Sequence, residues 1–183
     1  MPRINPVTPE ATPAKSTPLL EGVQKALGVT PNMMKTMAHS PAVLGAYLGF
    51  GQALGGSSLS GKLREQIALA VAGANTCDYC ASAHTALGKG LGVSEDELTR
   101  NLEGRSDDAR TDAALKFATA VVAKRGFVSD DDLSAVRQAG YGDAEITELI
   151  ATVVLNIFTN YFNHIAQTDI DFPLVNTQET VAA

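Results

Sequence analysis

The chain has 183 residues, of which 45% are hydrophobic, and a formal net charge of −6. This length lies within the range of a single domain, and this hydrophobic content is enough to form a buried core. An acidic chain lacks the clustered Lys and Arg that bind phosphate groups. We therefore expect neither nucleic acid nor an anionic membrane surface as a partner.

The first ten residues, MPRINPVTPE, contain no apolar run of the kind that an export signal requires. No later segment approaches the roughly eighteen uninterrupted apolar residues of a membrane-spanning helix. We therefore expect no membrane span and a cytoplasmic location. Two cysteines in a chain large enough to build its own core do not make a disulfide scaffold, so their role should be local.

Prolines punctuate the N-terminal part of the chain. Seven of the eight prolines lie in the first 41 residues, and residues 1–17 alone hold four of them, among Thr, Ala and Ser. Proline lacks a backbone N–H and disfavours the helix interior. We predict an extended arm over residues 1–17, without helical character, followed by a single helical domain over residues 18–183.

Helix start signals recur along the rest of the chain. A serine stands before each of five runs with helical periodicity, and we predict that these serines cap helices: Ser40, Ser60, Ser94, Ser106 and Ser129. Glu97 follows Ser94 in the pattern of a capping box. The aspartates after Ser106 and Ser129 suit the first turn of a helix better than a metal site. No segment alternates as a strand does, so the fold class is all-α, with about eight or nine helices.

The last long helix is predicted from about Ala144 to Gln167. Its apolar stripe is wider than a peripheral helix needs, so the helix is either central in the domain or buried against another subunit, and we favour the subunit interface. Asn156, Asn160 and His164 form a polar line at four-residue spacing. We interpret this line as a solvated or subunit-contact face rather than the border of a reactive site.

The stretch NTCDYCASAHTALGKG holds both cysteines and one of the three histidines. Cys77 and Cys80 stand three apart and His84 follows four residues later, so on a helix the three side chains share one face. Either Asn75 or Thr76 is expected to cap this helix. The cysteines then lie in its first turn, where free backbone N–H groups and the helix dipole stabilise a thiolate.

A thiolate at this place would be reactive at neutral pH. Lowering a thiol pKa from about 8.5 to about 6.5 raises the thiolate fraction at pH 7 from about 3% to about 75%. His84 would add a positive imidazolium or pass protons during oxidation of the sulfur. The spacing therefore suits a pair that cycles between dithiol and disulfide.

Two other interpretations of the cluster remain open. Zinc needs four ligands, so the two cysteines and the histidine would need Glu65, His39 or His164 from elsewhere in the chain. The plainest alternative is two buried cysteines beside a core histidine with no chemistry. We predict no metal and no other cofactor.

Glu65 completes a longer motif: Glu65, eleven residues, Cys77, two residues, Cys80, three residues, His84. This motif resembles the core of the alkylhydroperoxidase AhpD-like branch of the carboxymuconolactone decarboxylase family. The stretches PNMMKTMAHSPAVLGAY and NIFTNYFNHIAQTDIDFP are also similar to single-domain peroxidase-related members. The resemblance spans most of the chain beyond about Pro18.

The resemblance implies an all-helical fold that assembles as a homo-oligomer, often a trimer or hexamer, with an active site between helices near a subunit boundary. It implies that Cys80 attacks the peroxide as a thiolate and that Cys77 resolves the product as a disulfide. Glu65 would act as base or proton relay, and His84 would assist it. An external dithiol of the lipoyl or thioredoxin type would then reduce the disulfide.

Tyr79 departs from the family pattern, in which the well-developed alkylhydroperoxidases carry a histidine just before the second cysteine. Tyrosine titrates near pH 10, so it hydrogen-bonds but passes protons less readily at neutral pH. We expect that the replacement either weakens activity on alkyl hydroperoxides or indicates a different oxidant.

The function that we predict is a thiol-dependent peroxidase, in which Glu65, pressed between apolar helices, exchanges protons with Cys77 directly or through water. Lactone decarboxylation is one alternative, although paired thiols would be superfluous for it. A non-enzymatic dithiol redox sensor is the other. The cluster Met33, Met34 and Met37 is interpreted mainly as core packing and only secondarily as a hydroperoxide pocket.

Overall fold

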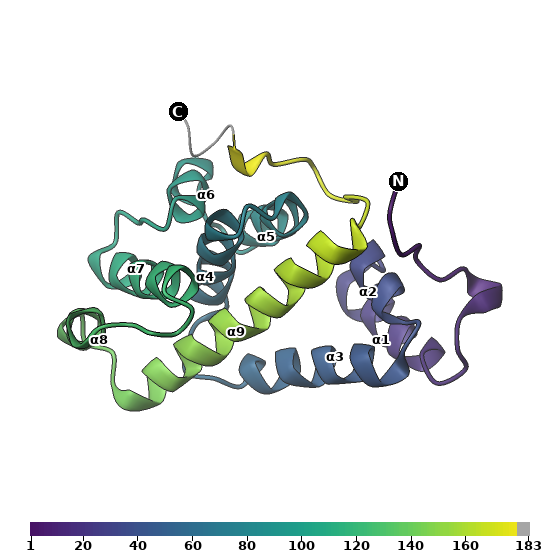
Figure 1. Ribbon diagram of the computed structural model, residues 1–183, viewed down its shortest axis with the longest axis horizontal. Helices are drawn as coiled ribbons and strands as arrows, with labels where there is room; N and C mark the ends of the chain where they lie inside the picture. The colour runs from purple at the N-terminus through teal and green to yellow at the C-terminus, as the bar shows by residue number, and fades with distance from the viewer. Residues whose placement is uncertain (179–183) are drawn as a thin grey trace.

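The computed structural model describes residues 1–178, and its regular secondary structure within that range is all helical, with no strand (Figure 1). The α-helices in chain order are α1 (Thr17–Leu27), α2 (Asn32–Met37), α3 (Pro41–Gly55), α4 (Gly61–Ala74), α5 (Asp78–Gly90), α6 (Glu95–Leu102), α7 (Ala109–Ala123), α8 (Asp130–Gln138) and α9 (Asp143–Ala166). The all-α prediction is confirmed, and the nine α-helices of the described part agree with the expected number.

Helix α4 is the centre of the domain and packs against α5, α6, α7 and α9. Every residue from Gln66 to Ala72 is buried. A glycine is required where α6 crosses α4, because a Cβ built on Gly73 would lie 1.9 Å from the carbonyl oxygen of Leu102. Because α4 is packed on several sides, its backbone is held in place, and the position from which Glu65 projects is fixed.

Four of the five predicted serine caps are confirmed: the side chains of Ser40, Ser60, Ser94 and Ser129 each accept a hydrogen bond from the backbone N–H three residues on. The prediction for Ser106 is wrong, because α7 begins after Asp108, whose carboxylate accepts from Thr111. The box at Ser94 is half formed. The side chain of Glu97 instead accepts hydrogen bonds from other side chains, including Asn101.

The N-terminal arm lies against the body of the domain. The backbone N–H groups of Arg3 and Ile4 donate to the carbonyl oxygen of Ala166 at the end of α9, over 2.7 and 3.2 Å. The proline-rich middle of the arm forms a 3-10 turn, η1 (Pro9–Ala11). The expectation of an arm without helical character is therefore wrong at these residues, because the fixed φ of proline suits the first position of a helical turn.

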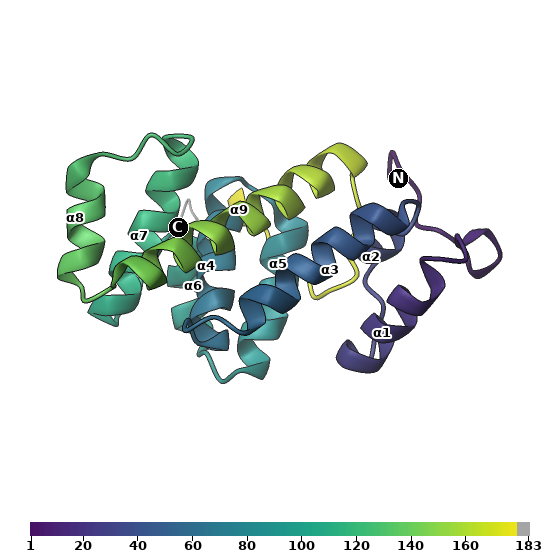
Figure 2. The same ribbon diagram turned by 90° about the horizontal axis from the view of Figure 1, so that it is seen from below.

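Helix α9 crosses the front of the molecule diagonally in Figure 1 and is seen from below in Figure 2. One face packs inside the domain, and the opposite face exposes apolar side chains: Ile150, Val154, Phe158, Tyr161 and Ile165. Among the residues described, α9 is the one helix long and apolar enough to cross a membrane by length and composition. Its contacts with α3, α4, α5 and α7 are those of a core helix. The wide stripe that the sequence shows therefore consists of two faces.

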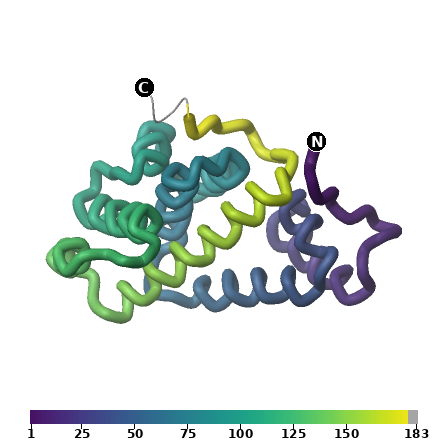
Figure 3. The backbone as a smooth tube through the Cα atoms, in the orientation of Figure 1, coloured from purple at the N-terminus to yellow at the C-terminus, as the bar shows by residue number. Residues whose placement is uncertain are grey.

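The last described segment, residues 168–178, folds back from the end of α9 over α5, as the tube in Figure 3 shows. We call it the C-terminal strap. The N–H of Val175 donates to the hydroxyl of Ser82 over 2.9 Å. Asp78 accepts two hydrogen bonds from Thr177, at 2.9 and 2.6 Å. The strap is thereby fastened across the first turns of α5.

Candidate active site

A sharp turn between α4 and α5 places the two cysteines. Thr76 adopts a left-handed backbone with φ of 53°, and Cys77 then takes the N-cap position of α5. The prediction that Asn75 or Thr76 caps this helix is wrong. Asn75 instead donates from its amide to the side-chain oxygen of Asn160, 2.9 Å away. Cys77 therefore begins α5, and Cys80 lies in its first turn.

Cys80 has an environment that favours the thiolate, although the residue is only 2% exposed. The amide nitrogen of Asn163 donates to its sulfur over 3.3 Å. The hydrogen bond from the thiol of Cys77 has the largest effect and lowers the pKa of Cys80. Burial raises this pKa, but the charge of His84 and the amides of Asn163 and Asn160 oppose burial. The pKa of Cys80 is lowered to about 6 as a result.

Cys77 has the opposite character. Its hydrogen bond to Cys80, followed by burial, raises the pKa of the Cys77 thiol far above its ordinary value. Both cysteines are free thiols and both are buried. The pair is thus electronically unequal at neutral pH, with the thiolate on Cys80 and the proton on Cys77.

His84 and Glu65 form a close pair between α5 and α4. The Nδ1 atom of His84 lies 2.6 Å from a carboxylate oxygen of Glu65, and each side chain is 21% exposed. Burial alone would lower the pKa of His84. The charge and hydrogen bond of Glu65, together with the negative charge of Cys80, outweigh burial and raise the pKa of His84. The pair is therefore an imidazolium and carboxylate over a wider pH range than an isolated histidine would allow.

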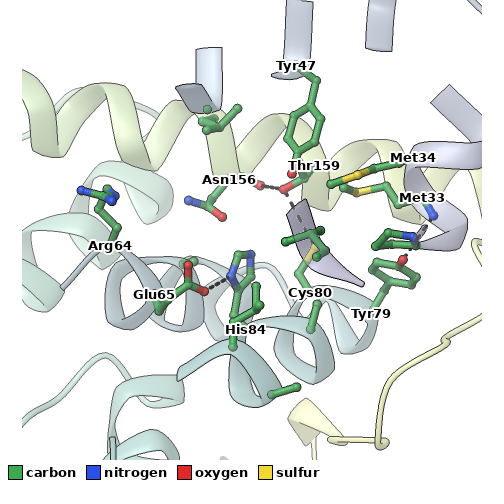
Figure 4. A pocket seen from close by; sticks show the side chains of 18 of the residues that line it. Met33, Met34, Tyr47, Arg64, Glu65, Tyr79, Cys80, His84, Asn156 and Thr159 are labelled. Carbon is green, nitrogen blue, oxygen red and sulfur yellow. Dashed lines mark hydrogen bonds and ion pairs between the residues drawn. The ribbon is translucent and has the colours of Figure 1, made fainter. Parts of the chain in front are cut away.

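These groups meet in a cavity of about 450 Å³. Figure 4 shows His84 and Cys80 side by side on α5, with Glu65 bonded to His84. Asn156 and Thr159 of α9 line the cavity as well, and most of the remaining wall is apolar. Cys77 is absent from the cavity wall within the described range, so the sulfur of Cys80 is the one that a ligand in the cavity would meet.

The structure brings four of the five predicted site residues to one cavity: Glu65, Tyr79, Cys80 and His84. Cys77 stands behind Cys80 at the start of α5. The hydrogen bond that the Glu65 side chain makes is with His84.

Tyr79 takes a structural role. Its hydroxyl donates to Asp171 of the strap over 2.9 Å and accepts from the N–H of Met33 over 3.1 Å. Its ring packs edge-on against Phe172. Burial raises the pKa of Tyr79 well above its ordinary value. The Tyr79 hydroxyl therefore links the strap to the start of α2.

Sequence reasoning missed the polar inner face of α9. Asn156 and Asn160 are 7% and 0% exposed, so their interpretation as a solvated or subunit-contact face is wrong, whereas His164 is exposed. Asn163 and Thr159, which were not predicted, both contact the sulfur of Cys80, the latter at 4.0 Å. The available signal was the helical spacing of these amides and hydroxyls within an apolar run.

The methionines divide between two roles. Met33 and Met34 line the cavity, and Met37 is buried in the core. Met33 also accepts a hydrogen bond at its sulfur from Asn163. The methionine cluster therefore contributes both to the core and to the wall of the cavity.

No group of three or more His, Cys, Asp or Glu within residues 1–178 is arranged to hold a metal ion. Of the fourth ligands considered for zinc, His39 is exposed and lies 2.9 Å from the carbonyl oxygen of Asn5 in the arm. His164 points to solvent from α9.

Solved structures share this fold along nearly the whole chain. A peroxidase-related protein of Silicibacter sp. TM1040 is 25% identical, with a TM-score of 0.80 over 91% of this chain and 89% of that one. A peroxidase-related protein with an alkylhydroperoxidase AhpD core, from Ralstonia eutropha JMP134, is 24% identical, with a TM-score of 0.84 over 98% and 94%. The fold is therefore AhpD-like.

A third similar structure has another activity. The debrominase Bmp8, bound to 2,3,4-tribromopyrrole, is 21% identical, with a TM-score of 0.79 over 98% of this chain and 96% of that one. The fold thus supports more than one reaction. No curated protein matches the chain. Residues 41–124, which contain Glu65, the cysteine pair and His84, match the sequence model of the carboxymuconolactone decarboxylase family.

Proposed function

We propose that the protein is a thiol peroxidase that reduces hydroperoxides by a dithiol and disulfide cycle. The observation that carries the proposal is the difference in pKa between the two cysteine thiols. Cys80, with its pKa lowered to about 6, faces a cavity, and Cys77, with its pKa raised, lies directly behind it. A thiolate is the nucleophile in such chemistry, and a neighbouring thiol resolves the product.

The cycle balances in three steps. The Cys80 thiolate attacks the terminal oxygen of ROOH, a sulfur–oxygen bond forms, the oxygen–oxygen bond breaks, and RO⁻ takes a proton to become ROH. The sulfenic acid of Cys80 then condenses with the thiol of Cys77, giving a disulfide and water. An external dithiol finally reduces the disulfide and is itself oxidised to a disulfide.

The pair of His84 and Glu65 is the proton source in the first step. An imidazolium beside the thiolate is positioned to protonate the departing alkoxide, and the raised pKa of His84 extends the pH range over which the ring is charged. Glu65 holds the ring by its 2.6 Å contact and stabilises the charged form. The two residues act together as one acid.

Because both sulfurs are buried, the reductant should be narrow enough to enter the cavity. Cys77 and Cys80 are 1% and 2% exposed, so a dithiol on the surface of a thioredoxin-like protein would have no direct approach. A lipoyl-type dithiol at the end of a flexible arm would fit a cavity of about 450 Å³. We propose a partner of this kind. A free dithiol of this type persists in a reducing compartment, which favours the cytoplasm.

The test is oxidation of the purified protein by a hydroperoxide, with free thiols counted before and after. Cys80→Ser should abolish peroxide-dependent thiol loss. Cys77→Ser is the matched variant and should trap a sulfenic acid on Cys80 that dimedone labels. If Cys80→Ser consumes peroxide as fast as the unaltered protein, the proposal is wrong. Stoichiometric oxidation with a change of assembly, and no turnover with a dithiol, would identify a redox sensor instead.

Reductive dehalogenation is the second candidate, and the specific observation in its favour is the largely apolar cavity beside a low-pKa thiolate. Attack of Cys80 on the halogen of an aryl bromide, followed by Cys77, would give the debrominated ring, bromide and a disulfide. The structural similarity to a debrominase makes this reaction worth measuring on the same protein. Bromide release from a bromopyrrole, against peroxide consumption, decides between the two.

A further inference from the structure

Tyr47 of α3 has a hydroxyl that the rest of the site leaves free. The residue lines the cavity, yet within residues 1–178 its hydroxyl has no hydrogen-bond partner. Two other tyrosines, Tyr79 and Tyr141, have bonded hydroxyls, and Tyr161 lies on the exposed face of α9. A tyrosine hydroxyl inside a protein usually has a partner, so a free one on a cavity wall indicates a position kept for a ligand.

The ring of Tyr47 is fixed by packing. It lies against Phe158 with ring centroids 6.5 Å apart and contacts the buried cluster that includes Met33 and Cys80. In Figure 4 it points into the cavity from α3, towards Cys80 on the opposite wall. The free hydroxyl therefore faces the space in front of the thiolate.

The neighbouring polar groups on α9 each make a hydrogen bond to the backbone. The hydroxyl of Thr159 donates to the backbone oxygen of Asn156 over 3.0 Å. The amide nitrogen of Asn156 donates one of its two N–H groups to the backbone oxygen of Thr152 over 2.9 Å. Of these three cavity groups, the Tyr47 hydroxyl is the one that makes no hydrogen bond within residues 1–178.

We propose that Tyr47 is a catalytic residue that donates a hydrogen bond to the inner oxygen of the bound hydroperoxide, the oxygen that carries the alkyl group. This inference rests on the proposed peroxidase function. When Cys80 attacks the outer oxygen, the electron pair of the breaking oxygen–oxygen bond moves to the inner oxygen. A fixed donor there stabilises the charge as it develops, and the proton of His84 then completes the alcohol.

The electrostatics of the cavity keep Tyr47 in the donor form. Burial has the largest effect, and the negative charges of Cys80 and Glu65 act in the same direction, so that the pKa of Tyr47 is raised to about 12. The hydroxyl therefore stays protonated at neutral pH and serves as a hydrogen-bond donor rather than as a base.

The test is Tyr47→Phe, which removes the hydroxyl and keeps the ring. With an alkyl hydroperoxide, the second-order rate of Cys80 oxidation should fall about 100-fold, the usual cost of one such donor. With a peroxycarboxylic acid it should fall much less, because the departing carboxylate is a weak base and needs little stabilisation. Equal losses with both oxidants, or no loss with either, would overturn the inference.

Two controls separate this inference from the proposed function. Alkylation of Cys80 by iodoacetamide expels iodide, so its rate should be the same in Tyr47→Phe and in the unaltered protein. A loss of alkylation would mean a misplaced thiolate and overturn the specific role of the hydroxyl. Tyr161→Phe makes the same change on the exposed face of α9 and should leave both oxidants unaffected. Absence of peroxide-dependent oxidation in the unaltered protein would instead reject the peroxidase itself.

Discussion

At the residue scale, the sulfur of Cys80 depends on a helix that lies far away in the sequence. The amide of Asn163 donates to it over 3.3 Å, across a separation of 83 residues. A hydrogen bond to a charged group is worth about 1.5–3 kcal/mol, which corresponds to about one to two pKa units. We expect that Asn163→Ala raises the pKa of Cys80 by about this amount.

The rate of iodoacetamide alkylation as a function of pH measures this change. Thr159→Val is the matched comparison, because the Thr159 hydroxyl lies 4.0 Å from the same sulfur and should matter less. If Thr159→Val moves the pH profile as far as Asn163→Ala does, the amide has no special part in stabilising the thiolate.

The pair of Glu65 and His84 predicts a bell-shaped dependence of peroxidase rate on pH. The rate should rise with pH as Cys80 ionises, near its pKa of about 6, and fall above the raised pKa of His84, where the imidazolium loses its proton. Glu65→Gln removes the charge that raises the pKa of His84. The alkaline limb should therefore move to lower pH, as steady-state rates across the pH range would reveal. An unmoved limb would assign the falling rate to another group.

The sequence was sufficient to select Glu65, Cys80 and His84, because their fixed spacing places them on two adjacent helices. It was insufficient for Asn163 and Tyr47. Asn163 contacts the sulfur of Cys80 and Tyr47 lines the cavity, each from a helix distant in sequence, and no local pattern connects such residues. The turn at Thr76 could not be predicted from local sequence either. Its φ of 53° lies in the left-handed region, which a β-branched residue such as threonine rarely adopts.

At the scale of elements, the crossing of α4 and α6 depends on Gly73. A methyl group there would meet the backbone oxygen of Leu102, which has no rotamer through which to move away. We expect Gly73→Ala to lower the free energy of unfolding by about 1–3 kcal/mol, the usual cost of overpacking. Chemical denaturation with urea measures this loss.

Gly49 of α3 is the matched control, because a Cβ there meets nothing within 4 Å and the position is exposed. Gly49→Ala should raise the free energy of unfolding by about 0.5–1 kcal/mol through helix propensity. Equal effects of the two substitutions would show that the close approach to Leu102 is not a constraint.

Helix ends were the elements best predicted from sequence. A serine with a helical run after it needs only its own neighbours to form a cap, so Ser40, Ser60 and Ser129 behave as local chemistry dictates. The error at Ser106 has the same origin. Asp108 is an equally good cap two residues later, so the local pattern by itself does not decide between the two.

At the scale of the whole molecule, the outer face of α9 predicts self-association. Its exposed apolar side chains, with Val154 47% and Ile165 65% exposed, form a stripe whose contact with water is unfavourable. We propose that a second copy of the chain covers it in a homo-oligomer.

Sedimentation velocity tests the assembly. Val154→Glu and Ile165→Glu should each shift the protein towards the monomer, because a carboxylate would be buried in the interface. Phe127→Glu is the control, since Phe127 is 87% exposed and lies between α7 and α8, away from the stripe. If Phe127→Glu dissociates the assembly and the α9 variants do not, the interface is elsewhere.

The positions of the two sulfurs have a kinetic consequence for the proposed peroxidase cycle. With Cys77 buried and Cys80 on the cavity wall, oxidant and reductant would both react with Cys80 from the same cavity, one after the other. The alcohol product has to depart before the electron donor can enter. Double-reciprocal plots at several donor concentrations should therefore be parallel, and excess donor should inhibit competitively against peroxide. Intersecting lines would mean that both substrates are bound at the same time, which would contradict this order of events.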